Sequence, residues 1–224
     1  MPFTKDDEGW WVADDAMYSF PKGIVVGPKS RTCSYGKGTL SVNADSADLA
    51  NCPEGDGSVS FGRHNIAKGK WSTVLGGNGN SASANMASVL GGDGNKALGE
   101  YSTVSAGSKN IASGVFSSVS GGTKNSATNN FSSVSGGTDS SANGIGSSVA
   151  GGFKNLANGA TSAVIGGISN VSSGRFSSIS GGHGNNSPGY TASVGGGFRG
   201  VASGKRATVV GGQARRATKP YQVA

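Results

Sequence analysis

The chain has 224 residues, of which 41 are glycine, 34% are hydrophobic and 7% are aromatic, and its formal net charge is +7. So few apolar residues exclude a conventional globular core, although the length could hold one or two ordinary domains. No apolar stretch is long enough for a signal peptide or a membrane span, so we expect neither in this chain.

Residues 1–57 differ in composition from the rest and are predicted to form a small N-terminal attachment or capping module. Five acids accompany a single basic residue, Lys5, in the first twenty positions. Four aromatic residues cluster there: Trp10, Trp11, Tyr18 and Phe20. These residues either cap the first open rung of the structure that follows, because a bare β edge invites aggregation, or anchor the protein to a larger assembly as buried interface residues.

Two short apolar runs, residues 23–27 and 39–42, are predicted strands that join this module to the rest of the chain. Cys33 and Cys52 are the only cysteines. They have no Cys-x-x-Cys spacing and no neighbouring histidine, which argues against zinc. Free thiols, a disulfide within the chain and a disulfide between chains all remain open, and closing such a loop would contribute about 3 kcal/mol.

Residues 58–219 form a repeat with a period of fifteen, followed by a short tail, residues 220–224. The aliphatic position of the repeat is occupied by Val59, Val74, Val89, Val104, Val119, Val134, Val149, Val164, Ile179, Val194 and Val209. Three residues later comes a glycine: Gly62, Gly77, Gly92, Gly107, Gly122, Gly137, Gly152, Gly167, Gly182, Gly197 and Gly212. Each unit is too short to be a domain and must stack on its neighbours.

The unit of the repeat is Ser-Val-Ser-Gly-Gly-x-x-Asn-x-Ala, then a Gly or Asn corner and a frequent aromatic residue, as in residues 118–132. Glycine at fixed corners supplies positive φ at no steric cost. The pattern therefore predicts two short strands and two tight turns per coil of an all-β, parallel β-solenoid. Eleven coils that rise about 4.8 Å each would make a shaft of about 50 Å.

The small side chains of each coil favour an oligomer. Each coil can bury one Val, one Ala and often one large residue, and burial contributes roughly 25 cal/mol per Å² of apolar surface. This free energy does not offset the conformational entropy lost when fifteen residues are ordered, which costs about 1.5 kcal/mol per residue. Three chains around an axis would bury a second face of every coil, so we expect a homotrimer. In an extended segment such as residues 116–119, Phe116 and Val119 point to opposite faces. Unless the strand bends between them, one lines the coil interior and the other the seam between chains.

The Ser-Val-x-x-Gly unit followed by Asn-x-Ala resembles the head repeats of trimeric autotransporter adhesins and related repeats of phage fibres. The resemblance covers residues 59–219 and implies a left-handed parallel β-roll and a trimer. The usual head repeat has about fourteen residues with an aliphatic residue just before the glycine. Because this chain has fifteen and mostly Gly-Gly, receptor specificity does not carry over.

The end of the repeat region is strongly basic. Six cations occur there without any acid: Arg199, Lys205, Arg206, Arg215, Arg216 and Lys219. They either keep the last coil soluble and prevent end-to-end stacking, or attract an anionic surface such as a host polysaccharide. Aromatic residues do not interleave with these cations along the sequence, which argues against nucleic acid as a partner.

No catalytic, cofactor or metal site is expected. His64 and His183 have no carboxylate or cysteine that the repeat would place beside them. The acids Asp93, Glu100 and Asp139 are too few for a calcium site in every coil or for paired catalytic carboxylates. A polysaccharide-cleaving enzyme is therefore the least favoured function.

The favoured function is that of a non-enzymatic virion protein, a trimeric phage fibre or spike on the capsid, collar or tail. It would be made in the host cytoplasm and held by its N-terminal module to other virion proteins. The alternatives are an adhesin head at a bacterial cell surface and a secreted ice- or surface-binding solenoid. An ice-binding face needs ranks of Thr, whereas Ser dominates here and Thr is scattered at Thr73, Thr103 and Thr208.

Overall fold

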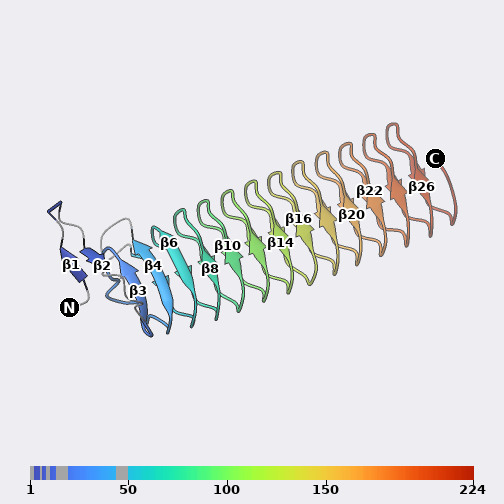
Figure 1. Ribbon diagram of the computed structural model, residues 1–224. Coiled ribbons are helices and arrows are strands. Elements are labelled where there is room, and N and C mark those ends of the chain that lie inside the picture. The colour runs from blue at the N-terminus through green and yellow to red at the C-terminus, as the bar shows by residue number, and fades with distance from the viewer. Residues whose placement is uncertain (1–2, 6, 9–10, 14–19, 44–49) are drawn as a thin grey trace.

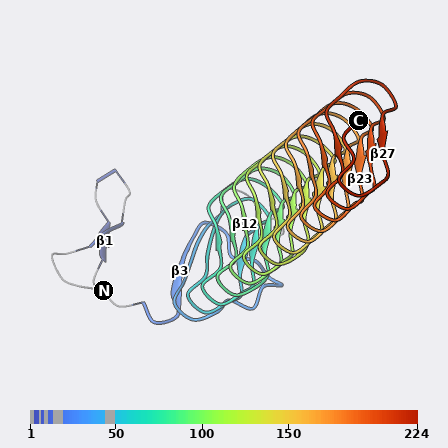
Figure 2. The same ribbon diagram turned by 90° about the vertical axis from the view of Figure 1, so that its right-hand side faces the viewer.

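The computed structural model describes residues 3–5, 7–8, 11–13, 20–43 and 50–224. Over these residues the chain winds into a parallel β-solenoid without any helix (Figure 1). The successive coils stack along one axis, and Figure 2 shows them as overlapping loops of similar shape, each displaced from the one before along the rod. Each coil adds one short strand to each of two sheets, one with 13 strands and one with 12. This confirms the predicted all-β solenoid with two strands per coil.

The strands of the two sheets alternate along the chain. The 13-stranded sheet contains β3 (Gly23–Val26), β4 (Thr39–Asn43), β6 (Val59–Gly62), β8 (Thr73–Val74), β10 (Ser88–Val89), β12 (Thr103–Val104), β14 (Ser118–Val119), β16 (Ser133–Val134), β18 (Ser148–Val149), β20 (Ala163–Val164), β22 (Ser178–Ile179), β24 (Ser193–Val194) and β26 (Thr208–Val209). The 12-stranded sheet contains β5 (Cys52–Pro53), β7 (Ile66–Ala67), β9 (Ser81–Ala82), β11 (Lys96–Ala97), β13 (Ile111–Ala112), β15 (Ser126–Ala127), β17 (Ser141–Ala142), β19 (Leu156–Ala157), β21 (Val171–Ser172), β23 (Asn186–Ser187), β25 (Val201–Ala202) and β27 (Arg216–Ala217). A separate antiparallel pair consists of β1 (Phe3–Lys5) and β2 (Trp11–Ala13).

A single chain closes the interior of the rod. Val119 and its equivalents in the 13-stranded sheet, from Val74 to Val209, are at most 1% exposed. The alanines of the 12-stranded sheet, such as Ala127, are equally buried. The shortage of burial inferred from composition therefore does not appear inside the coil. Copies of the chain have no interior to share, so any oligomer must form through the outer faces.

The first valine of the series does not lie where the fifteen-residue spacing predicts. Val59 pairs with Thr73, and Ser60 pairs with Val74, so Ser60 takes the interior position and Val59 is only partly buried. Only Phe61 separates Ser60 from the turn glycine Gly62, whereas two residues separate Val74 from Gly77. This coil is therefore one residue shorter between the interior position and the turn. Val59 lies fifteen residues before Val74 by coincidence, because the true equivalent of Val74 is Ser60.

Parallel stacking also begins earlier than residue 58. Strands β3 and β4 pair in parallel with each other, and β4 pairs in parallel with β6. At the opposite end, Val223 bridges to Thr208 in the 13-stranded sheet. The side-chain oxygen of Gln222 accepts hydrogen bonds from the backbone N–H groups of Thr218 and Lys219, at 2.8 and 3.1 Å. Gln222 thus takes the place of the carbonyl that bonds the equivalent donors one coil earlier, where the N–H groups of Ser203 and Gly204 donate to Ala217.

A ladder of buried asparagines holds one corner of most coils. Asn110 is fully buried, and its side-chain nitrogen donates to the carbonyls of Ala106 and Gly122, both at 2.9 Å. Its side-chain oxygen accepts from the backbone N–H of Asn125 in the next coil, also at 2.9 Å. The ladder already includes Asn51, one coil before the first asparagine that the repeat indicated, and the Asn51 N–H in turn donates to the side-chain oxygen of Asn43 at 2.8 Å. Ser140 and Gly200 substitute for asparagine further along.

A second interior column carries serine hydroxyls, several of which have no partner. The hydroxyls of Ser58, Ser72, Ser102, Ser117, Ser147 and Ser162 are buried without a hydrogen bond. By contrast, the hydroxyl of Ser177 donates to the Gly174 carbonyl and lies 2.7 Å from the Ser172 hydroxyl. Alanine occupies the same column at Ala87, Ala192 and Ala207.

This contrast predicts opposite effects of two identical substitutions. Ser102→Ala should leave the stability unchanged or raise it by up to about 1 kcal/mol, because it removes an unpaired buried hydroxyl. Ser177→Ala should lower the stability by about 1 kcal/mol, because it breaks a made hydrogen bond and strands the Ser172 hydroxyl. Denaturant unfolding midpoints of the two variants test this. Equal losses in both would contradict it.

Candidate interaction surfaces

Large exposed side chains line one edge of the N-terminal half of the rod. They are Trp71, Met86, Tyr101, Phe116 and Phe131, called the ring ladder below, and they are 41–62% exposed. The rings of Tyr101 and Phe116 stack with centroids 4.7 Å apart, and those of Phe116 and Phe131 stack at 5.5 Å. Successive coils therefore present a continuous apolar strip to solvent, outside a core that is already complete.

The backbone of the ring ladder adopts a conformation that L-residues disfavour. Its five residues have φ between +55° and +59°, and the same column contains glycine at Gly57 and Gly146. The left-handed region costs a non-glycine residue about 1–2 kcal/mol. A hydrogen bond between coils compensates in part, as where the Phe116 N–H donates to the Glu100 carbonyl at 3.0 Å. Large rings at this corner are both strained and exposed, and within the single chain only their stacking on neighbouring rings offsets that cost.

The opposite edge, half a coil away, carries mostly polar and charged residues, with Phe153 and Ile168 as exposed apolar exceptions. Lys109, Lys124 and Lys154 occupy successive or near-successive coils with positive φ, and Asp139 lies among them. His64 and Arg199 belong to the same column, and His183 lies one residue before it; all three are exposed. Among the described residues, no three His, Cys, Asp or Glu side chains are close enough to hold a metal ion.

The six cations of the basic end do not form one patch. Lys205, Arg206 and Lys219 lie at the edge that carries the ring ladder, whereas Arg199 lies at the opposite edge. Arg216 belongs to β27, the last strand of the 12-stranded sheet, and Arg215 directly precedes it. The sequence places the six cations near one another, but the fold distributes them over the two edges of the coil and the β27 side between them.

Aromatic rings do lie beside the cations in space, so the expectation that rings and cations are not interleaved is wrong. The Arg199 guanidinium lies 4.9 Å from the Phe198 ring centroid, and the Lys154 ammonium lies 4.9 Å from that of Phe153. Lys205 with Tyr190 and Arg206 with Tyr221 form similar pairs at the edge that carries the ring ladder. The adjacent pairs are visible in the sequence, whereas pairs such as Tyr190 and Lys205 join residues fifteen positions apart that become neighbours only when the coils stack.

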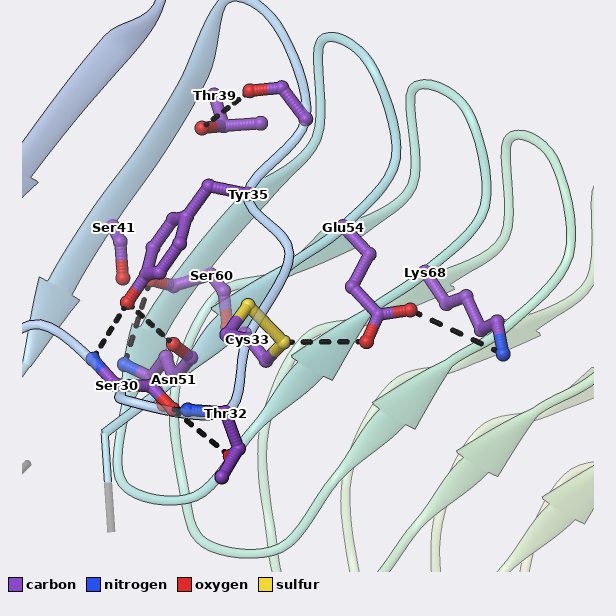
Figure 3. The surroundings of a disulfide bond; sticks show 12 residues. Ser30, Thr32, Cys33, Tyr35, Thr39, Ser41, Asn51, Glu54, Ser60 and Lys68 are labelled. Carbon is purple, nitrogen blue, oxygen red and sulfur yellow. Dashed lines mark hydrogen bonds and ion pairs between the residues drawn. A yellow bond between two sulfur atoms is a disulfide. The ribbon is translucent and has the colours of Figure 1, made fainter. Parts of the chain in front are cut away.

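At the N-terminal end, Cys33 and Cys52 form a disulfide within the chain, with a Cα–Cα distance of 5.4 Å (Figure 3). The bond fastens the loop between β3 and β4 to β5, the first strand of its sheet. In the same loop, the Gly36 N–H donates to the Pro53 carbonyl at 3.1 Å, and the Tyr35 hydroxyl donates to the Asn51 carbonyl at 3.3 Å. This loop covers the open edge of β5. Capping of the first open rung was one of the two roles predicted for the aromatic cluster of the first twenty residues.

The aromatic residues proposed as an anchor are only partly placed. Trp10 and Tyr18 lie outside the described residues. Trp11 is in β2, opposite Lys5. Phe20 is 45% exposed at the start of the described segment before β3. The structure therefore leaves the attachment role of these four residues as a prediction.

A scan against models of known protein families gives no match, and a search of curated proteins finds no relative. Within the described ranges, no helix is suited to crossing a membrane. The class that the fold defines is a parallel β-solenoid repeat protein.

Proposed function

We propose that the protein is a non-enzymatic fibre or spike of a phage particle, in which three chains associate along their ring ladders. The observation that carries the proposal is the apolar ladder itself. Contiguous exposed apolar strips on soluble proteins mark interaction sites, and this one has no counterpart within its own chain. A rod anchored at its N-terminal end would project the basic coils outward, where they can meet a host surface.

A second copy of the chain suits the ring ladder because both ladders have the same period. Rings that repeat once per coil, at about 4.8 Å, can be matched along their whole length only by a partner with the same repeat. An identical chain meets this condition at every coil. Three chains around an axis then cover the ladder of each. The alternation of an extended segment does not support this seam, because Phe116 lies at a corner with φ of +55°, outside the strand β14 that contains Val119.

Substitution of the ladder tests this seam. Replacing Tyr101, Phe116 and Phe131 together by asparagine, which tolerates positive φ, should convert trimers into single chains without loss of the β signal in circular dichroism. A matched control is Leu75→Ser with Leu90→Ser, which removes exposed apolar area on the outer face of the 13-stranded sheet. Size-exclusion chromatography with light scattering gives the mass of each. A triple variant that stays trimeric would contradict the seam.

Electron microscopy tests the virion assignment. Gold-labelled antibody against the protein should mark fibres or spikes on particles from lysed host cells. Particles without label, from lysates that contain the folded protein, would count against a virion protein and in favour of a cell-surface adhesin head.

A secreted ice- or surface-binding solenoid is the second candidate, favoured by one feature. The outer face of the 13-stranded sheet carries a rank of hydroxyl residues: Thr73, Ser88, Thr103, Ser118, Ser133, Ser148, Ser178, Ser193 and Thr208. Neighbours in the rank bond to each other, as Ser88 to Thr103 at 3.3 Å and Ser193 to Thr208 at 3.1 Å. Freezing hysteresis of the purified protein decides between the candidates, and the fibre proposal predicts none.

A further inference from the structure

The ring-ladder edge changes character in the C-terminal half of the rod. Two adjacent corner positions of successive coils carry a mixed group of rings and cations, called the basic ring patch below. Its members are Arg175, Phe176, Tyr190, Lys205, Arg206 and Tyr221. All six are exposed, the three rings by 41–64%.

Contacts between these side chains arrange the patch without any partner. The Arg175 guanidinium lies 4.8 Å from the centroid of the Phe176 ring, and the Lys205 ammonium lies 5.9 Å from that of Tyr190. The rings of Phe176 and Tyr190 meet edge to face at 5.9 Å. A cation over an aromatic face is attracted by about 0.5–1 kcal/mol at exposed sites. The rings therefore hold the cations over the edge of the rod.

The last pair extends the patch toward the end of the chain. The Arg206 guanidinium lies 5.7 Å from the centroid of the Tyr221 ring, and its Nη1 donates to the Tyr221 hydroxyl at 3.3 Å. No Asp or Glu follows Asp139 in the sequence. The cations of the patch consequently have no carboxylate of their own half of the rod to neutralise them.

We propose that the basic ring patch binds an acidic polysaccharide, a polymer of sugars that carry carboxylates. The cations suit the carboxylates, the tyrosine hydroxyls suit sugar hydroxyls, and the exposed parts of the rings suit the apolar C–H faces of sugars. The same two positions recur in each coil, which matches a polymeric ligand that runs along the edge beyond Phe131. The seam between chains is confined to the apolar stretch from Trp71 to Phe131, because the cations of three copies would repel each other further along the edge. The inference rests on the proposed function, since it gives the outward half of the fibre its target.

The arrangement of the rings favours a polysaccharide over single-stranded nucleic acid. Proteins that bind single strands offer open ring faces on which successive bases stack. In this patch a cation lies over a face of Phe176, Tyr190 and Tyr221, and the edge of one ring meets the face of another. One face of each ring is engaged by a cation, so successive bases cannot be sandwiched between open rings, while the remaining ring surface and the charged groups stay exposed.

Binding of the full chain to polygalacturonate, neutral dextran and oligothymidylate at physiological salt tests the proposal. The protein should bind polygalacturonate and leave dextran unbound. Lys205→Gln with Arg206→Gln should weaken this binding at least about tenfold, equivalent to roughly 1.4 kcal/mol. Phe176→Ala with Tyr190→Ala, which changes no charge, should weaken it severalfold. Each variant is first shown to keep the thermal midpoint and circular dichroism of the parent.

Arg215→Gln with Arg216→Gln is the matched control, because it removes the same charge from a different face and should change the affinity less than about twofold. Equal weakening by both charge variants would show a general attraction of polyanions and overturn the patch. Tighter binding of oligothymidylate than of polygalacturonate would assign the surface to nucleic acid instead. A trimeric fibre that ignores polygalacturonate refutes this inference alone, whereas a monomer that binds it refutes only the trimer.

Discussion

Gly122→Ala is expected to destabilise the rod by about 4 kcal/mol or more, a loss reserved for severe steric conflict. Gly122 has φ of +85°, and a Cβ there would lie 2.1 Å from the Gly137 carbonyl oxygen and 2.5 Å from the Asn125 side-chain nitrogen. Both atoms belong to the stacking contacts, so the coils would have to separate. Each coil bonds only to its neighbours, and separation at one turn leaves two shorter stacks.

The neighbouring glycine provides the control for this effect. A Cβ on Gly121 would meet nothing within 4 Å, and its φ is not in the left-handed region. Gly121→Ala should therefore be neutral or stabilise by about 0.4–1 kcal/mol, because alanine restricts the unfolded chain. Denaturant midpoints and amide hydrogen exchange of the flanking coils measure both variants. A Gly122→Ala protein with the midpoint of Gly121→Ala would refute the stacking geometry.

Asn110→Ala is expected to cost about 3 kcal/mol, because three hydrogen bonds of a fully buried side chain are lost. The Asn125 N–H and the Ala106 carbonyl lose their side-chain partner in the interior. The cavity adds to the cost.

Serine at the same position should be tolerated better than alanine. Ser140 occupies this column naturally, and its hydroxyl oxygen accepts from the Asn155 N–H at 3.2 Å. Asn110→Ser should therefore cost roughly half as much as Asn110→Ala, since it keeps an acceptor for the next coil. Thermal unfolding of the two variants measures the difference. Equal costs would show that the ladder bond to the next coil contributes little.

The period of the sequence predicted the most regular features of the fold. All eleven glycines of the repeat have positive φ, from +81° to +100°, as the turn assignment required. The valine rank from Val74 onward is buried, and the asparagines bond from coil to coil. These features depend only on position within one coil, which a single period reveals.

Features that depend on how the chain turns around a coil could not be predicted from the period alone. The shortened coil at Val59 is invisible because a valine happens to keep the spacing. Asn51 was missed because it lies fourteen, not fifteen, residues before Asn65. The basic ring patch joins residues fifteen positions apart, such as Tyr190 and Lys205, and writing the sequence in rows of fifteen would have aligned them. The pairing of Cys33 with Cys52 needed coordinates, because spacing alone allowed three outcomes.

Each chain completes its own core, and we propose that copies join through the exposed ring ladder. Sedimentation equilibrium of the intact protein at micromolar concentration, with and without reductant, tests it most directly. The predicted result is three times the chain mass of 22.0 kDa in both conditions, because the disulfide lies within one chain and does not link copies. The mass of a single chain, or a trimer that dissociates only on reduction, would contradict it.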